Sequence, residues 1–180
     1  MTLEIRPATL ADAHQVADVF LRSRKELVPF APLAHSDDDV RAWIPRGLIP
    51  AGRTTVAVVD GAVVGFISVS TAEDCSWITQ LYLHPDWIGR GIGTRLLDGA
   101  RRALPPPIRL YTFQENQRAR AFYERRGFEA VKFTDGSGNE EKCPDVLYEW
   151  RPVDAAASPS ASPRRPASRP QLPPDLCASS

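Results

Sequence analysis

A glycine-rich turn between a predicted strand and a predicted helix constrains this chain more than any other feature. It reads Gly89-Arg90-Gly91-Ile92-Gly93 and follows an apolar strand, 77–84, that Pro85 ends. The helix is predicted from an apolar stripe at helical spacing: Gly93, Leu96, Leu97, Ala100 and Leu104. Glycines let backbone N–H groups approach a ligand closely, and a helix N-terminus attracts anions. The segment therefore predicts a pyrophosphate site.

Two better-known phosphate-binding turns do not fit this segment. A P-loop needs Gly-Lys-Ser/Thr, whereas the chain has Gly93-Thr94-Arg95. A dinucleotide fingerprint needs a third glycine where Thr94 or Leu96 stands, and it should follow the first strand. The remaining alternative is a plain helix N-terminus whose glycines serve only to turn the chain.

The rest of residues 1–151 alternates between strand and helix patterns. Strands are expected at 3–6, 54–59, 62–70, 77–84, 108–113, 128–133 and 146–150. Helices are expected at 11–26, at 37–48, from Gly93 to the prolines at 105–107, and from Asn116 to Gly127. Asp60-Gly61 predicts a two-residue hairpin turn, and Ser36 with Asp39 predicts a capping box. The order is β-α-α-β-β-β-α-β-α-β-β.

Two motifs in this order resemble the GNAT N-acetyltransferase superfamily. Residues 88–93 are similar to its motif A, Arg/Gln-x-x-Gly-x-Gly/Ala, with Leu81-Tyr82-Leu83-His84-Pro85 as the lead-in. The run from Asn116 through Phe122-Tyr123 to Gly127-Phe128 is similar to motif B. The resemblance covers about residues 3–150 and implies an α/β fold, with a mixed, mostly antiparallel sheet of about seven strands splayed at its middle and about four flanking helices. Ile88 departs from the pattern, because the family has Arg or Gln there.

The resemblance implies direct transfer of an acetyl group from acetyl-CoA to a primary amine in a ternary complex. It implies cofactor contacts at Leu81, Tyr82, Leu83, Gly89, Arg90, Gly91, Ile92, Gly93, Thr94 and Asn116. Tyr123 matches the tyrosine that protonates the departing thiolate, since a phenol stays protonated at neutral pH. Packing for Tyr123 and N-capping for Asn116 are the structural alternatives.

The general base is not identified by any motif. The strand before the turn offers Trp77, Thr79 and Gln80, and none of these side chains is a base. The remaining candidates are Glu26, His35, Glu73, Asp74, Glu140, Glu141 and Asp145. A water chain to an exposed acid is a further possibility.

The acceptor side is expected to involve the polar loop 134–145. Its four carboxylates favour a cationic amine, although a solvated turn has the same composition. A small amine or an amino-acid-like acceptor is the preferred hypothesis. The alternatives are a protein lysine or N-terminus, or a catalytically weak acyl-CoA sensor or interaction module.

Composition separates a domain from a tail and excludes several classes of protein. In residues 152–180, 19 of 29 residues are Pro, Ala or Ser, which predicts a disordered tail after a GNAT domain at 1–151. Lys+Arg and Asp+Glu both number 22, so nucleic acid is not expected as a partner. Three distant cysteines argue against a disulfide scaffold and against a metal site. No signal pattern or apolar run of membrane length is present, so a cytoplasmic protein is expected. A homodimer is an open alternative to a monomer.

Overall fold

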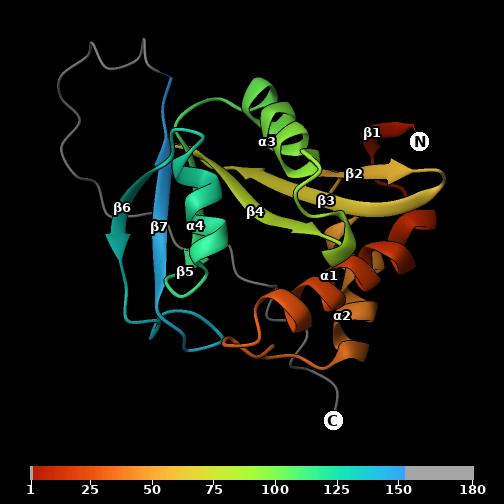
Figure 1. The fold of residues 1–180 in the computed structure, drawn as a ribbon, viewed down its shortest axis with the longest axis horizontal. Helices are drawn as coiled ribbons and strands as arrows, with labels where there is room; N and C mark the ends of the chain where they lie inside the picture. The colour runs from red at the N-terminus through yellow and green to blue at the C-terminus, as the bar shows by residue number, and fades with distance from the viewer. Residues whose placement is uncertain (1, 153–180) are drawn as a thin grey trace.

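Seven strands form a single sheet in the computed structural model, which describes residues 2–152 (Figure 1). The strands are β1 Leu3–Pro7, β2 Thr54–Val59, β3 Ala62–Thr71, β4 Ser76–Leu83, β5 Ile108–Phe113, β6 Glu129–Phe133 and β7 Asp145–Trp150. The helices are α1 Ala13–Leu27, α2 Asp37–Trp43, α3 Ile92–Ala103 and α4 Gln117–Glu124. The predicted disordered tail lies outside the described residues, except for Pro152.

The strand order is β1-β2-β3-β4-β5-β7-β6, and only β4 and β5 run parallel. These two strands pair at Ser76 with Ile108 and at Trp77 with Arg109. Beyond those pairs β4 stays with β3 as far as Leu83, while β5 follows β7 (Figure 1). The sheet is therefore splayed at its middle, as the family resemblance predicts.

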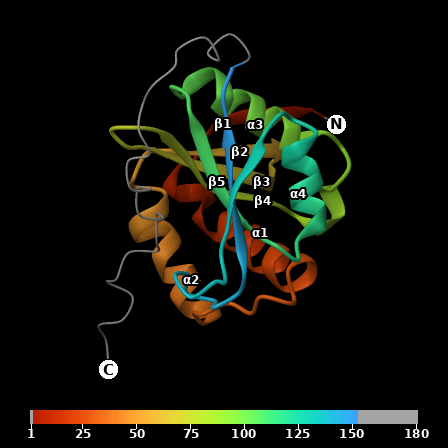
Figure 2. The ribbon, with the colours of Figure 1, turned by 90° about the vertical axis from the view of Figure 1, so that its left-hand side faces the viewer.

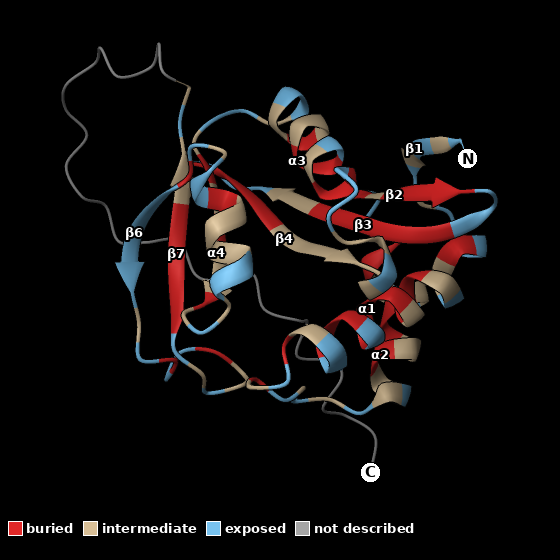
Figure 3. Cartoon of the chain, viewed as in Figure 1, coloured by how far each residue is buried: buried red, intermediate tan, exposed pale blue. Residues whose placement is uncertain are grey.

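Helices cover both faces of the sheet (Figure 2). On one face α3 and α4 pack over Ala57, Val64, Ile67 and Ile78. On the other face α1 and α2 pack over Val56, Val58, Val63 and Phe66. Neighbouring residues of β2 thus point to opposite faces, as strand geometry requires. Strand β7 is mostly buried, whereas β6 at the edge is exposed along its length (Figure 3).

Local sequence signals place most element ends correctly. The Ser36 hydroxyl accepts a hydrogen bond from the Asp39 N–H, and Asp60 and Gly61 have φ values of 49° and 85°, which suit the predicted hairpin turn. The predicted helix 37–48 is wrong in its second half. A π-helical turn, Ile44–Leu48, follows α2. Pro45 has no N–H to donate, so the α-helical bonding pattern is interrupted there.

Candidate active site

The glycine turn is open toward solvent and leaves the N-terminus of α3 without a side-chain cap. Gly89 and Gly91 have φ values of 80° and 78°, and Gly91 is the N-cap residue of α3. A Cβ atom added at either position would meet nothing within 4 Å. Packing therefore does not require glycine at these two positions. Their positive φ favours glycine, and the space beside both residues is open to a ligand.

Gly93 has a different role from the two glycines before it. A Cβ atom there would lie 3.3 Å from Leu83 Cδ1 and 3.5 Å from the Phe122 ring. Its missing side chain thus lets the first turn of α3 pack against both β4 and α4.

A cleft of about 440 Å³ runs from the glycine turn to the splay. Strand β4 contributes Leu81–Leu83, and the turn contributes Ile88, Gly89 and Gly91. Three arginines in or directly after α4 line the same cleft: Arg118, Arg125 and Arg126. No Asp or Glu among the described residues lines it. The cleft is therefore electropositive and suits a phosphate-bearing ligand.

A second, smaller pocket of about 180 Å³ lies on the other side of the splay. Aromatic side chains from α1, α2, β4 and β5 form part of its wall: Phe20, Trp43, Trp77, Tyr111 and Phe113. Trp77 and Tyr111 stack with an interplanar angle of 8° across the splayed strands. The pocket is therefore shaped for a small molecule with an apolar part.

The two cavities share part of their lining at the splay. The shared residues come from α1, β4 and α4 or their ends: Val28, Leu81, Tyr82, Asn116, Ala119 and Tyr123. A ligand in the electropositive cleft and a ligand in the aromatic pocket would therefore meet at this place.

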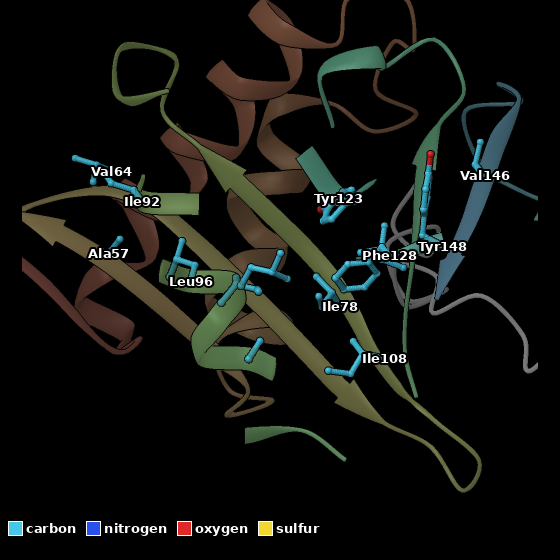
Figure 4. Close-up of a cluster of buried hydrophobic side chains, with 14 of the residues drawn as sticks. Ala57, Val64, Ile78, Ile92, Leu96, Ile108, Tyr123, Phe128, Val146 and Tyr148 are labelled. Atoms are coloured by element: carbon cyan, nitrogen blue, oxygen red, sulfur yellow. The ribbon is translucent and has the colours of Figure 1, made fainter. Parts of the chain in front are cut away.

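Tyr123 lies at the junction and is almost entirely buried, with 8% of its surface exposed. Figure 4 shows its ring near Ile78, Phe128 and Tyr148, and its ring centroid is 5.6 Å from that of Phe128. Burial, with a smaller contribution from Tyr82, raises the pKa of the Tyr123 phenol above its ordinary value. The Tyr123 side chain therefore packs in the core and also lines the place where the two cavities meet. Its hydroxyl keeps its proton at neutral pH.

The polar end of the aromatic pocket joins two loops that are far apart in sequence. Arg24 Nη2 donates to Glu141 Oε1 at 3.0 Å, and His35 Nε2 lies 3.2 Å from Glu140 Oε2. Burial disfavours the charge on Arg24, but Tyr82 and Glu141 outweigh it, so the pKa of the guanidinium is raised. Arg24 therefore neutralises Glu141 inside the protein.

The expectation for the polar loop needs correction, because its carboxylates do not act together. Asp145 is buried and accepts a hydrogen bond from Asn139 at 2.9 Å, while Asp135 accepts from Ser137 within the loop. Glu141 pairs with Arg24. Among the four, Glu140 is the carboxylate that faces the pocket without an arginine or lysine partner.

The structure also reduces the set of candidate bases. Glu26 is exposed and pairs with Arg22, and Glu73 and Asp74 are exposed near the β3–β4 turn. None of these three lines either cavity. His35 and Glu140 remain at the aromatic pocket and in contact with each other.

Most of the predicted cofactor residues lie together at the cleft, with two exceptions. Arg90 is exposed, with its guanidinium 4.7 Å from the Trp87 ring centroid, and Thr94 accepts a hydrogen bond from Arg126. Neither of them lines the cleft. Asn116 lines it and also caps α4, accepting from the Ala119 N–H at 3.1 Å. Sequence reasoning missed the arginines of α4, although Arg125-Arg126 stand inside the second motif.

Among the described residues, no group of three or more His, Cys, Asp or Glu side chains is placed to hold a metal ion. No helix in this part of the chain is long and apolar enough to cross a membrane.

Comparison with known sequences finds acetyltransferases. The family described as Acetyltransferase (GNAT) family matches residues 20–128. The spermidine N(1)-acetyltransferase of Thermoplasma acidophilum is 26% identical over 155 residues, which cover 76% of this chain and 94% of the relative. The peptidyl-lysine N-acetyltransferase YiaC of Escherichia coli is 23% identical, over 81% of this chain and 95% of the relative. The uncharacterized N-acetyltransferase MJ1207 of Methanocaldococcus jannaschii is 33% identical, but the match spans only 41% of that relative's length.

Solved structures of low sequence identity share the fold. The PaiA N-acetyltransferase of T. acidophilum in complex with coenzyme A has a TM-score of 0.67 at 24% identity, covering 84% of this chain and 99% of that one. Apo YjaB of E. coli has a TM-score of 0.68 at 21% identity, covering 83% and 98%.

Proposed function

Since the chain belongs to the GNAT acetyltransferase family, we propose that it transfers the acetyl group of acetyl-CoA to a small primary amine held in the aromatic pocket. The family match confirms the family and the class of enzyme, an acetyl-CoA-dependent N-acetyltransferase, that the two sequence motifs predict. The observation that carries the finer proposal is the junction of the two cavities at Tyr82, Asn116 and Tyr123.

The electropositive cleft suits acetyl-CoA. The open surface over Gly89 and Gly91 leaves room for a pyrophosphate beside the N-terminus of α3. Beyond Trp77, β4 has no partner strand on its β5 side, so the backbone of Leu81–Leu83 is available to a pantetheine arm. This arrangement brings the thioester to the junction, where the acceptor pocket opens.

Tyr123 is proposed as the acid that protonates the departing coenzyme A thiolate. Its buried phenol has a raised pKa and lines both cavities. A neutral donor at this place stabilises the thiolate as the carbon–sulfur bond breaks.

The pair His35–Glu140 is proposed as the acceptor of the amine's proton. Glu140 Oε2 lies 3.2 Å from His35 Nε2, so it can orient the imidazole and stabilise the imidazolium. In this step an N–H bond of the substrate ammonium breaks and an N–H bond forms on the imidazole. The free amine then attacks the thioester carbonyl, and the carbon–sulfur bond breaks as Tyr123 protonates the thiolate. The second proton lost by the nitrogen as the amide forms returns Tyr123 to its phenol form.

The acceptor is proposed to be small and to carry an apolar part beside its amine. Aromatic side chains line one part of the wall, and Glu140 supplies the carboxylate for an ammonium group. The relatives include a spermidine acetyltransferase and a peptidyl-lysine acetyltransferase, so polyamines and peptides belong in the test.

The proposal is tested by measuring coenzyme A thiol release from acetyl-CoA with a panel of arylalkylamines, alkylamines, polyamines, amino acids and lysine peptides. We expect turnover with small amines, and we expect Tyr123→Phe to lower kcat at least about tenfold with acetyl-CoA affinity unchanged. Glu140→Gln should raise the acceptor KM. Unchanged turnover in Tyr123→Phe would contradict the acid role, and acetyl-CoA binding without turnover on any amine would favour an acyl-CoA-binding module.

A further inference from the structure

The inference concerns how the cleft holds the pyrophosphate when position 88 lacks the usual polar side chain, and it rests on the proposed function. Ile88 lines the cleft where a motif of this kind has Arg or Gln. An isoleucine side chain can donate no hydrogen bond to a phosphate oxygen. A hydrogen-bonding side-chain contact to the pyrophosphate must therefore come from another position or be absent.

Arg126 lines the same cleft as Ile88 and can supply such a contact. It follows α4 and donates from Nη1 to the Phe122 carbonyl at 2.9 Å and from Nη2 to the Thr94 hydroxyl. Its guanidinium carbon also lies 3.9 Å from the Phe122 ring centroid. These contacts hold the guanidinium rigidly across the gap between the end of α4 and the first turn of α3.

The position of Arg126 is electrostatically unusual without an anion. Thr94 is the third residue of α3, so the guanidinium lies at the positive end of that helix, which no side chain caps. Its Nε atom is buried and has no hydrogen-bond partner among the described residues. Arg118 and Arg125 line the same cleft, and no described carboxylate there offsets the three charges. A phosphate group beside the turn would offset the clustered positive charge of the three arginines and the helix N-terminus.

We therefore propose that Arg126 binds the pyrophosphate of acetyl-CoA and replaces the motif side chain that Ile88 cannot provide. The competing explanation is a purely structural role, in which Arg126 only ties the end of α4 to α3.

Calorimetric titration with acetyl-CoA and with 3′-dephospho-CoA separates these explanations. We expect Arg126→Gln to weaken both ligands by about tenfold or more, because both contain the pyrophosphate. The matched control is Arg95→Gln, which removes the same charge from an exposed position on α3 outside the cleft. Its affinities should stay within about twofold of the parent, as expected for a screened surface charge.

A second variant tests the replacement directly. Ile88→Arg should restore most of the lost affinity in the Arg126→Gln background and change the parent little. Equal affinities in Arg126→Gln and Arg95→Gln would overturn the proposal, as would a loss in Arg126→Gln that Ile88→Arg does not restore. A loss seen with acetyl-CoA but not with 3′-dephospho-CoA would place Arg126 at the 3′-phosphate and also overturn it. A parent that binds neither ligand would instead refute the proposed function.

Discussion

The two cavities that meet at Tyr123 are built in different ways. The cofactor cleft is made largely from backbone and from short sequence motifs: the end of β4, the glycine turn and the start of α4. The acceptor pocket is made from side chains, and its polar end depends on contacts such as Arg24 to Glu141, 117 residues apart. A site built from local backbone geometry can be found in a sequence, whereas a site built from long-range side-chain contacts can vary without leaving a motif.

The largest expected effect is on stability, from removal of Glu141. Arg24 and Glu141 expose only 6% and 13% of their side chains, so Glu141→Met leaves a buried guanidinium without its counter-charge. We expect the free energy of unfolding in urea to fall by about 3 kcal/mol, as for other broken buried pairs. Glu26→Gln, which breaks the exposed pair with Arg22, is the control and should cost no more than about 0.5 kcal/mol. Similar losses in the two variants would mean that the Arg24 pair is not essential to the pocket.

The next effect is on cofactor affinity, from a side chain in the glycine turn. Gly91→Val forces a β-branched residue to a φ of 78°, a strain of about 1–2 kcal/mol, and places methyl groups over the helix N-terminus. We expect acetyl-CoA affinity, measured by calorimetry, to fall by at least about tenfold. Gly99→Ala is the control, since Gly99 lies inside α3 and a Cβ atom there meets nothing within 4 Å. It should leave affinity unchanged and stabilise the protein by about 0.5–1 kcal/mol. Parent-like affinity in Gly91→Val would argue against the turn as the pyrophosphate site.

A smaller effect on stability is expected at Asn116, which is one of the residues that line both cavities. Asn116→Ala removes the cap of α4 and should lower the unfolding free energy by about 1 kcal/mol. Asn116→Ser keeps a capping oxygen and should recover most of that loss. If Asn116 also contacts the cofactor, acetyl-CoA affinity will stay reduced in Asn116→Ser. If Asn116→Ser recovered both the unfolding free energy and the acetyl-CoA affinity, capping of α4 would be the whole role of Asn116.

The smallest effect is a pH dependence that should be nearly flat on the alkaline side. An ordinary phenol has a pKa near 10, and burial raises that of Tyr123, so the acid form persists through mildly alkaline pH. We expect kcat to vary by less than about twofold between pH 8 and pH 9.5, measured by thiol release in constant ionic strength. A fall centred below pH 9 that disappears in Tyr123→Phe would contradict this assignment.

The sequence by itself determined the elements of the fold and most of the cofactor cleft. Strand alternation, the caps at Ser36 and Asn116, and the glycines at 89 and 91 are local signals, because the backbone conformation they require involves only neighbouring residues. The splay of the sheet was predicted through the resemblance of the two motifs to the GNAT superfamily. The π-helical turn after α2 shows the limit of this approach, since Pro45 interrupts a pattern whose apolar spacing continues.

Only the tertiary structure decided which charged residues act together. Seven residues were candidates for the base in the sequence. Folding placed His35 beside Glu140, paired Glu141 with Arg24 and buried Asp145 against Asn139. It also brought Arg126 to the first turn of α3 and into the same cleft as Ile88. A charge acts on whatever lies within a few ångströms, and distance between residues far apart in sequence is set by packing and not by any local pattern.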